Sequence, residues 1–230
     1  MLSVADLSFS YGEVQALRNI SLDVPSATIV SVMGRNGVGK TTLMKNIVGI
    51  LRSSAGIIQL DSQSIEKTPA HQRILAGIGY VPQGRMIFPK LTVEENLRVG
   101  LSGSLKRKLV PDEVLDLFPV LRQMCDRMGG DLSGGQQQQL AIGRALVTDP
   151  KILILDEPTE GIQPNVIQQI GQVLTQLVEQ RQMAILIVEQ YLDFVREFCQ
   201  HFYIMNRGEI VANAEAEGLT QEIIREYLSV

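Results

Sequence analysis

The sequence predicts one α/β domain with a mostly parallel central sheet. Short strand-like runs alternate with helical patterns along the 230 residues. The runs at 152–155 and 183–188 are uninterrupted and rich in isoleucine, leucine and valine, which is typical of strands buried on both faces of a parallel sheet. No linker, internal repeat or low-complexity segment divides the chain. We therefore expect a single domain over residues 1–230.

The N-terminal third predicts strands and two helices. Residues 1–30 hold short apolar runs separated by polar breaks, at 2–7, 16–20 and 28–33. A glycine-rich turn follows, and then the helical pattern TTLMKNIVGIL. Residues 56–81 return to strand-like pieces around a helix at 70–77.

Helices dominate the rest of the chain. The stretch 92–146 is mainly helical, and Thr92-Val93-Glu94-Glu95 has the form of a capping box at its start. Helical patterns at 164–181 and 191–199 flank the buried strand at 183–188. The segment FYIMNRGEIV predicts a hairpin that turns at Asn206-Arg207-Gly208.

Composition excludes several classes of protein. Apolar residues make up 45% of the chain, and the net charge of −4 argues against a general nucleic-acid or anionic-membrane binder. The longest apolar run, 183–188, is far shorter than the roughly 20 residues that span a bilayer. The N-terminus has no secretory signal pattern. Cys125 and Cys199 have no metal-binding spacing, so we expect two reduced thiols in a cytosolic protein.

Residues 34–41, GRNGVGKT, match the phosphate-loop pattern G-x-x-x-x-G-K-[ST] between a strand and a helix. Its glycines let successive backbone N–H groups point at phosphates, and the helix N-terminus adds its dipole. Lys40 can reach the β- and γ-phosphates of a nucleoside triphosphate, and the Thr41 hydroxyl can bind Mg²⁺. The alternative is a glycine-rich turn that matches by chance.

Asp156 and Glu157 follow the strand at 152–155, where a parallel sheet delivers its ligand-binding groups. Asp156 is placed to hold Mg²⁺ through water, and Glu157 to orient or deprotonate an attacking water. Taken alone, this pair would be read as a solvated loop. Beside a phosphate loop, the catalytic interpretation is favoured.

A predicted helix begins with Ser133, Gly134, Gly135 and Gln136. A helix end of this kind offers amide donors to a second anion. Either the chain binds two nucleotides, or this helix end serves the nucleotide of a neighbouring chain. A serine N-cap followed by flexible glycines is the structural alternative.

Taken in order, GRNGVGKT, LSGGQ and ILILDEP resemble the Walker A, signature and Walker B motifs of the ABC ATPase family over essentially the whole chain. The resemblance implies a P-loop NTPase fold with an N-terminal antiparallel β subdomain and an α-helical subdomain. The nucleotide-binding core then takes residues 1–82 and 147–230, and the helical signature part takes 83–146.

The resemblance also implies the ligands of Mg-ATP and the catalytic groups. Tyr11 in FSYG is similar to the aromatic that stacks on adenine, and Gln83 in YVPQG resembles the Q-loop glutamine, a ligand of nucleotide and metal. The metal ligands are then Thr41, Gln83 and Asp156, and the catalytic residues Lys40, Glu157 and Gln190. The nucleotide is held by Gly34, Arg35, Asn36, Gly37, Val38, Gly39, Lys40, Thr41 and Thr42 of one protomer and by Ser133, Gly134, Gly135 and Gln136 of another.

Such a cassette is an ATP hydrolase that works as a homodimer or heterodimer. The segments VPQGRMIFPKLTVEENL and VEQYLDF are most similar to ATP subunits of branched-chain amino-acid importers, in particular the urea or short-chain amide branch. Those systems imply two transmembrane permease subunits, contacted here around residues 83–97, and an external solute-binding protein. They also imply a peripheral position at the cytoplasmic face of a bacterial-type inner membrane and no nucleic-acid partner.

Three residues depart from the family pattern. Gln190 replaces the switch histidine that contacts the γ-phosphate, and a neutral amide predicts slower hydrolysis. Gln163 stands where the D-loop aspartate is usual. Gln139 replaces a frequent arginine, and we expect it on a solvated helix face.

Two other functions compete with transport. A soluble ABC ATPase of DNA repair or translation resembles longer chains with coiled-coil or basic insertions, which this sequence lacks. A GTPase requires an N/T-K-x-D element that reads guanine, and none is present. A small-molecule kinase leaves LSGGQ unexplained.

Overall fold

A computed structural model describes residues 1–102 and 109–228. The strands are β1 (Leu2–Tyr11), β2 (Val14–Val24), β3 (Ile29–Met33), β4 (Ala55–Leu60), β5 (Gln63–Ser64), β6 (Ile78–Val81), β7 (Ile152–Asp156), β8 (Ala184–Val188), β9 (His201–Asn206) and β10 (Glu209–Glu215). The α-helices are α1 (Lys40–Ile47), α2 (Ala70–Ala76), α3 (Val93–Leu101), α4 (Asp112–Leu117), α5 (Pro119–Gln123), α6 (Gly134–Leu146), α7 (Pro164–Arg181), α8 (Leu192–Phe198) and α9 (Gln221–Ile223). Short turns of other helix types are η1 (Gly129–Asp131), η2 (Ala216–Gly218) and η3 (Ile224–Leu228).

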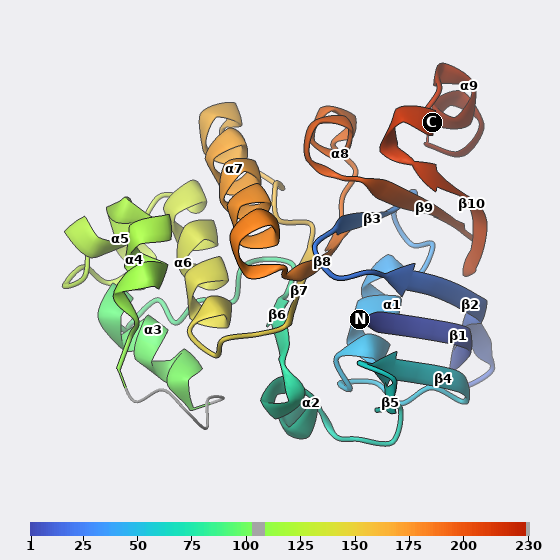
Figure 1. Ribbon diagram of the computed structural model, residues 1–230, viewed down its shortest axis with the longest axis horizontal. Helices are drawn as coiled ribbons and strands as arrows, with labels where there is room; N and C mark the ends of the chain where they lie inside the picture. Colours follow the sequence, from blue (N-terminus) through green and yellow to red (C-terminus); the bar gives the residue numbers. More distant parts are fainter. Residues whose placement is uncertain (103–108, 229–230) are drawn as a thin grey trace.

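Two sheets form the body of the molecule. The larger has the order β10-β9-β3-β8-β7-β6, and only its β9–β10 hairpin is antiparallel. The smaller is antiparallel and has the order β2-β1-β4-β5. Helix α1 lies between the two sheets, whereas α7 and α8 lie on the other side of the larger one (Figure 1). The predicted mostly parallel α/β sheet is confirmed.

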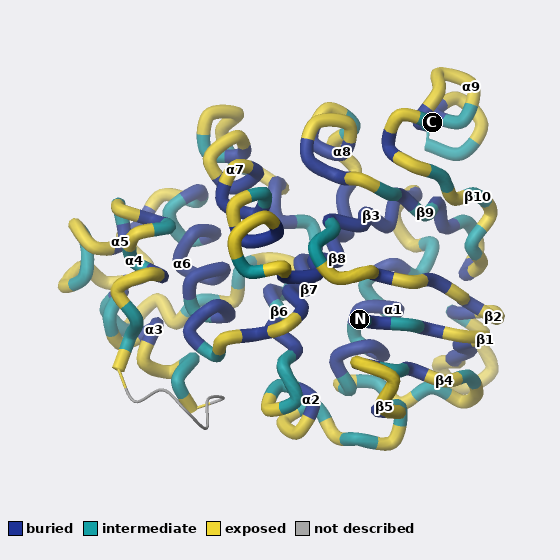
Figure 2. Tube along the Cα trace, viewed as in Figure 1, coloured by how far each residue is buried: buried dark blue, intermediate teal, exposed yellow. Residues whose placement is uncertain are grey.

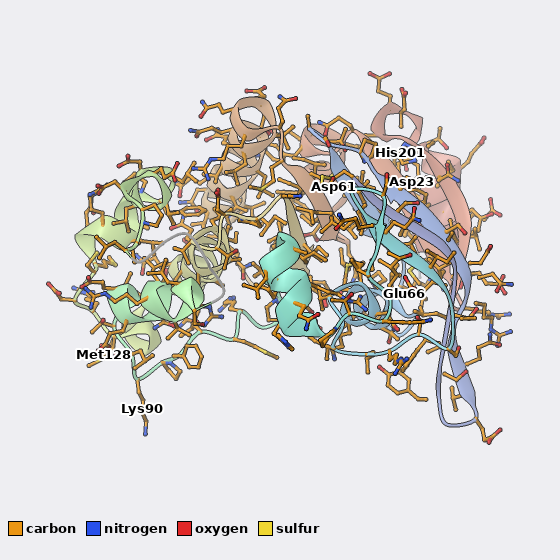
Figure 3. The ribbon with its side chains drawn as sticks, turned by 60° about the horizontal axis from the view of Figure 1, so that its bottom comes forward. Asp23, Asp61, Glu66, Lys90, Met128 and His201 are labelled. Atoms are coloured by element: carbon orange, nitrogen blue, oxygen red, sulfur yellow. The ribbon has the colours of Figure 1, made fainter. Side chains whose placement is uncertain are left out.

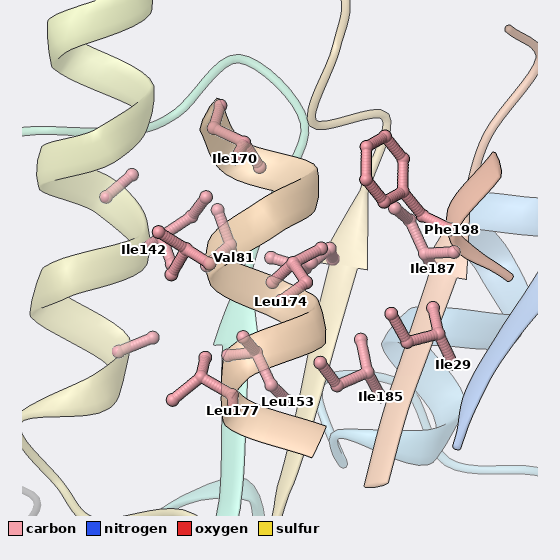
Figure 4. Close-up of a cluster of buried hydrophobic side chains, with 14 of the residues drawn as sticks. Ile29, Val81, Ile142, Leu153, Ile170, Leu174, Leu177, Ile185, Ile187 and Phe198 are labelled. Atoms are coloured by element: carbon pink, nitrogen blue, oxygen red, sulfur yellow. The ribbon is translucent and has the colours of Figure 1, made fainter. Parts of the chain in front are cut away.

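Successive side chains of the central strands point to opposite faces of the sheet and so belong to two separate cores. In β8, Ile185 and Ile187 belong to the core beneath α7, and Leu186 and Val188 belong to the core around α1. The first core is shown in Figure 4, where Leu174 of α7 lies among the strand side chains. Both faces of the sheet are therefore covered at its centre, where β3, β7 and β8 are buried along their whole length (Figure 2).

Helices α3 to α6 form a separate group beside β6 (Figure 1). The predicted capping box begins α3: Thr92 N–H donates to Glu95 Oε2 at 2.8 Å, and Glu95 N–H donates back to Thr92 Oγ1 at 3.2 Å. Lys90 extends away from the body just before this helix (Figure 3). Within the predicted helical stretch, residues 103–108 lie outside the described residues.

Strands β1 and β2 are longer than their apolar runs predict. Residues 2–7 and 16–20 were expected, but the pairing extends from Leu2 to Tyr11 and from Val14 to Val24. Register shifts interrupt the ladder between them, and the apolar alternation is lost at those shifts. The extension places Tyr11 at the tip of the hairpin.

Candidate functional site

The loop between β3 and α1 depends on its glycines. Gly34, Gly37 and Gly39 have φ angles of 146°, 81° and 111°, values that side chains disfavour. A Cβ atom on Gly34 would collide with the carbonyl of Met205, and one on Gly39 would lie 2.9 Å from the carbonyl of Ala16. The glycine-rich turn is therefore required by both conformation and close packing.

Lys40 begins α1 and is the buried cation of the loop. Its Nζ donates to the carbonyls of Gly34 and Arg35 at 2.7 and 2.9 Å, and Glu157 Oε1 lies 4.0 Å away. Burial lowers the pKa of Lys40, while the neighbouring carboxylates, Glu157 first, act to raise it. The ammonium is thus held at the centre of the turn.

Asp156 ends β7 and faces the start of α1. The Thr41 hydroxyl donates to its Oδ1 at 3.3 Å, and its Oδ2 is buried with no hydrogen-bond partner among the described residues. Burial raises the pKa of Asp156 to about 6, and Glu157 adds to this effect. A buried carboxylate oxygen without a donor is suited to a cation.

This pKa predicts a dependence of stability on pH. Asp156→Asn is expected to stabilise the metal-free protein at neutral pH by on the order of 2 kcal/mol, because the buried charge is removed. Since the folded pKa of about 6 exceeds the ordinary 3.8, the penalty in the wild type is complete above pH 6 and disappears as the pH falls from 6 to 3.8. The free energy of unfolding of both proteins, measured with urea on either side of this interval, tests the prediction. A wild-type-to-variant difference that is the same at every pH contradicts the prediction.

Four loops meet at Glu157, which has a left-handed φ of 51°. Gln83 Nε2, in the loop after β6, donates to Glu157 Oε2 at 2.8 Å. Gln190 Nε2, in the loop after β8, donates to Glu157 Oε1 at 2.8 Å and to Asn36 Oδ1 at 2.9 Å. The strand order β3-β8-β7-β6 makes this possible, because the carboxyl ends of these parallel strands lie at one edge.

A cleft of about 750 Å³ opens beside these loops. Tyr11 stands at its rim, half exposed, with its hydroxyl 3.5 Å from Thr42 Oγ1 and its ring edge-on to Phe9. Of the predicted site residues, the cleft is lined by Tyr11, Asn36, Gly37, Val38, Gly39, Lys40, Thr41, Thr42, Gln83 and Glu157.

Sequence reasoning missed part of this lining. The cleft also takes in Val14, Gln15, Ala16 and Arg18 of β2, Glu160, and Arg207 and Gly208 of the β9–β10 turn. The backbone N–H of Arg18 donates to the carbonyl of Gly208 at 2.8 Å, which joins the two hairpins at the cleft wall. The hairpin signal at 206–208 was recognised, but nothing local indicated that this turn reaches the phosphate loop.

The helix end predicted as a second anion site is a capped N-terminus that lies outside the cleft. Ser133 caps α6: its Oγ accepts the Gln136 N–H at 3.4 Å, and its own N–H donates to Gln136 Oε1 at 2.9 Å. A Cβ atom on Gly135 would collide with Val166 at 2.8 Å, and one on Gly134 would lie in tight contact with the Arg85 guanidinium at 3.0 Å. None of residues 133–136 is among the described residues that line the cleft. A single chain therefore does not bring the N-termini of α1 and α6 together.

Comparison with known proteins identifies the family to which this pattern of motifs belongs. The sequence profile described as ABC transporter matches residues 17–160. This chain belongs to the ABC transporter family. The high-affinity branched-chain amino acid transport ATP-binding protein BraG of Pseudomonas aeruginosa is 38% identical over 213 residues, covering 92% of this chain and 91% of BraG. The lipopolysaccharide export system ATP-binding protein LptB of Haemophilus influenzae is 34% identical over 237 residues, covering 99% of this chain and 97% of LptB.

A solved ABC cassette has the same architecture. The dimeric cassette MJ0796, in a post-hydrolysis state bound to ADP and Pi, matches with a TM-score of 0.84 at 25% identity, covering 95% of this chain and 100% of that one. The predicted P-loop fold and ATP hydrolase activity are confirmed. ABC cassettes dimerise and work with membrane permease subunits. Over residues 1–102 and 109–228, this cassette has no helix with the length and apolar character of a membrane span.

One expectation for this ABC cassette is wrong. Gln139 was expected on a solvated face, but it is 4% exposed, and its Nε2 donates to Gln169 Oε1 of α7 at 3.2 Å. Helix α6 is covered by α7 and the other helices, so the run of four glutamines turns two of them, Gln138 and Gln139, inward. By contrast, Gln163 is exposed before α7, and its side chain makes no capping hydrogen bond there.

Proposed function

We propose that the chain is the ATP-hydrolysing subunit of an importer and that it works as a dimer with two composite sites. The observation that carries this is the separation of its two phosphate-recognising helix ends. The α1 end lines the cleft, and the Ser133 end of α6 lies outside it. A second cassette facing the first supplies the missing half of each site, in agreement with the dimeric MJ0796 cassette.

The cleft accommodates ATP in one orientation. The triphosphate lies on the backbone amides of residues 34–42, with Lys40 at the β- and γ-phosphates. Tyr11, exposed at the rim and next to Thr42, is placed to stack on the adenine ring. Ser133, Gly134, Gly135 and Gln136 of the second cassette then meet the γ-phosphate from the opposite side.

The residues around Asp156 fit Mg²⁺, which prefers oxygen ligands. Its unpartnered Oδ2, the Thr41 hydroxyl and the Gln83 side-chain oxygen are the groups that would hold the ion. When bound, the ion neutralises charge on the β- and γ-phosphates. Glu157, held between Gln83 and Gln190, orients and deprotonates the attacking water.

Gln190→His is expected to raise the turnover number by about fivefold, because an imidazolium adds a charge-assisted hydrogen bond to the γ-phosphate that a neutral amide lacks. The measurement is kcat at saturating Mg-ATP. Gln163→Asp also restores a family residue but lies outside the cleft, so it serves as the comparison. Turnover that is unchanged or slower in Gln190→His contradicts the prediction.

An apolar groove of about 550 Å³ is the proposed contact with the permease subunits. It lies between α2, the segment after Gln83, α3 and α6, and its exposed apolar side chains are Leu75, Met86, Phe88 and Val99. Exposed apolar patches of this kind mark interaction sites. The predicted contact at residues 83–97 forms one wall of the groove, and α2 adds a wall that the sequence did not indicate.

The transport role is tested with the cassette assembled in proteoliposomes with its two permease subunits. Leu75→Glu is expected to remove most of the stimulation of ATPase activity by the permeases, because a charge enters the apolar groove. Val211→Glu also replaces an exposed apolar residue by glutamate, but on β10 and outside the groove lining, and it is expected to keep the stimulation. A cassette whose turnover does not respond to permeases at all is a soluble ATPase, which overturns the transport proposal.

Uptake is favoured over export because BraG is the more similar relative, 38% against 34% for LptB. The proposed solutes are urea, short-chain amides or branched-chain amino acids, delivered by an external binding protein. The proposed location is the cytoplasmic face of a bacterial inner membrane, with either a homodimer or a heterodimer of cassettes.

Uptake of labelled urea, acetamide and leucine is measured in cells lacking this chain and complemented with wild type or Lys40→Ala. Unaffected uptake with lipopolysaccharide retained at the inner membrane supports the export alternative instead.

A further inference from the structure

Glu189 is a buried carboxylate that the proposed function does not use. It follows β8, directly precedes Gln190 and is only 3% exposed. Burying a carboxylate is unfavourable unless hydrogen-bond donors surround it. The donors that surround Glu189 therefore identify what it holds.

Both oxygens of Glu189 have partners. Oε1 accepts the backbone N–H groups of Gln190 and Tyr191 at 2.7 and 3.0 Å. Oε2 accepts the hydroxyl of Thr159 at 2.8 Å, and the backbone of Thr159 also donates to the carboxylate. Burial raises the pKa of Glu189, and these four hydrogen bonds oppose the increase. One side chain thus joins the loop after β7 to the loop after β8.

These two loops carry groups that must meet in the cleft. Glu157 lies two residues before Thr159, and Gln190 directly follows Glu189. The ladder between β7 and β8 ends at the pair Asp156–Val188, with one further bond from Glu157 N–H to the Val188 carbonyl. Beyond that point the Glu189 bridge connects the loops, and the Gln190 amide reaches Glu157 Oε1 at 2.8 Å.

We propose that Glu189 is a positioning residue for ATP hydrolysis, which fixes the Gln190 loop against Thr159 so that the Gln190 amide meets Glu157. This inference rests on the proposed function, because it takes Glu157 as the catalytic carboxylate. Glutamine has a long, neutral side chain, so charge does not direct it to one partner. Its orientation therefore depends on the backbone that carries it, and Glu189 holds that backbone.

A double-mutant cycle tests the proposal in the complete chain. Glu189→Ala is expected to lower kcat about tenfold with little change in KM for ATP, because the loop loses its charged acceptor but the nucleotide contacts remain. If Glu189 acts through Gln190, the double variant Glu189→Ala/Gln190→Ala turns over as Gln190→Ala alone does. Losses that multiply overturn the proposal, and so does a rise in KM at constant kcat.

Three further variants keep the result decisive. Glu197→Gln removes an exposed carboxylate on α8 that accepts from Gln168 at 2.8 Å, and it is expected to behave as wild type in the same assay. If Glu189→Ala fails to fold, the cycle is run with Glu189→Gln, which keeps the shape of the side chain. Thr159→Val, which removes only the hydroxyl donor, is expected to lower kcat in the same direction, and normal kcat there counts against the bridge.

Failure of this inference is distinguishable from failure of the proposed function. A wild-type chain without ATP-dependent dimerisation, or one whose turnover survives Lys40→Ala, contradicts the composite ATP site itself. Turnover that requires Lys40 but shows independent effects of Glu189 and Gln190 contradicts only the positioning role.

Discussion

Glu157→Gln is expected to lower ATP turnover by about 10²–10⁴-fold and to leave a closed, ATP-bound dimer. The carboxylate lies where both of its oxygens are in contact with amides, from Gln83 and Gln190, and its nearest cation is Lys40 at 4.0 Å. A glutamine keeps the shape but cannot accept a proton from water. Binding and closure remain possible, whereas the chemical step becomes slow.

Two measurements check this prediction: the rate of phosphate release, and the oligomeric state in Mg-ATP by size-exclusion chromatography. Glu160→Gln is the matched comparison, because Glu160 also accepts from Gln83, at 3.2 Å, and lines the same cleft. It is expected to retain most of the turnover. A Glu157→Gln protein that hydrolyses ATP at the normal rate means that another group is the catalytic base.

Lys40→Ala is expected to lower turnover by at least about 10²-fold and to weaken ATP binding. Lys40 is the buried cation at the centre of the phosphate loop, and it is 4% exposed. Its ammonium has two carbonyl partners, Gly34 and Arg35, and we expect it to exchange them for phosphate oxygens when nucleotide enters. Without it, the triphosphate faces backbone dipoles alone.

ATPase rates and ATP binding by equilibrium titration measure this effect, with thermal unfolding to show that the variant is folded. Lys45→Ala changes the same residue type in the last turn of α1, outside the cleft lining, and is expected to keep activity. Preserved hydrolysis in Lys40→Ala excludes the phosphate loop as the site of turnover.

The parts of the site that depend on neighbouring residues could be predicted from the sequence. The phosphate loop was recognised because its glycines, lysine and threonine are contiguous, and the structure gives those glycines φ angles that favour glycine. The predicted capping box at Thr92 is likewise local, since it joins residues three positions apart. At Ser133 the sequence indicated a serine N-cap, and the structure adds the reciprocal bond from Gln136.

The errors and omissions concern residues whose surroundings come from distant segments. In the sequence, Gln139 is one polar residue in a predicted helix, and only the packing of α7 on α6 buries it. Glu189 is one charged residue after a predicted strand, and only the nearby hydroxyl of Thr159 shows that it joins two loops. Arg18 and Arg207 reach the cleft because two hairpins distant in sequence come together there.

The phosphate loop, the helix caps and the buried strands follow from the sequence alone, because a few adjacent residues set loop conformation, helix capping and strand burial. How these parts meet depends on the three-dimensional fold. Gln190 contacts Asn36 across 154 positions, and Glu157 lies between Gln83 and Gln190, because β3, β8, β7 and β6 are neighbours in one sheet. That order results from burying two apolar cores at once, a property of the whole chain that no local pattern contains.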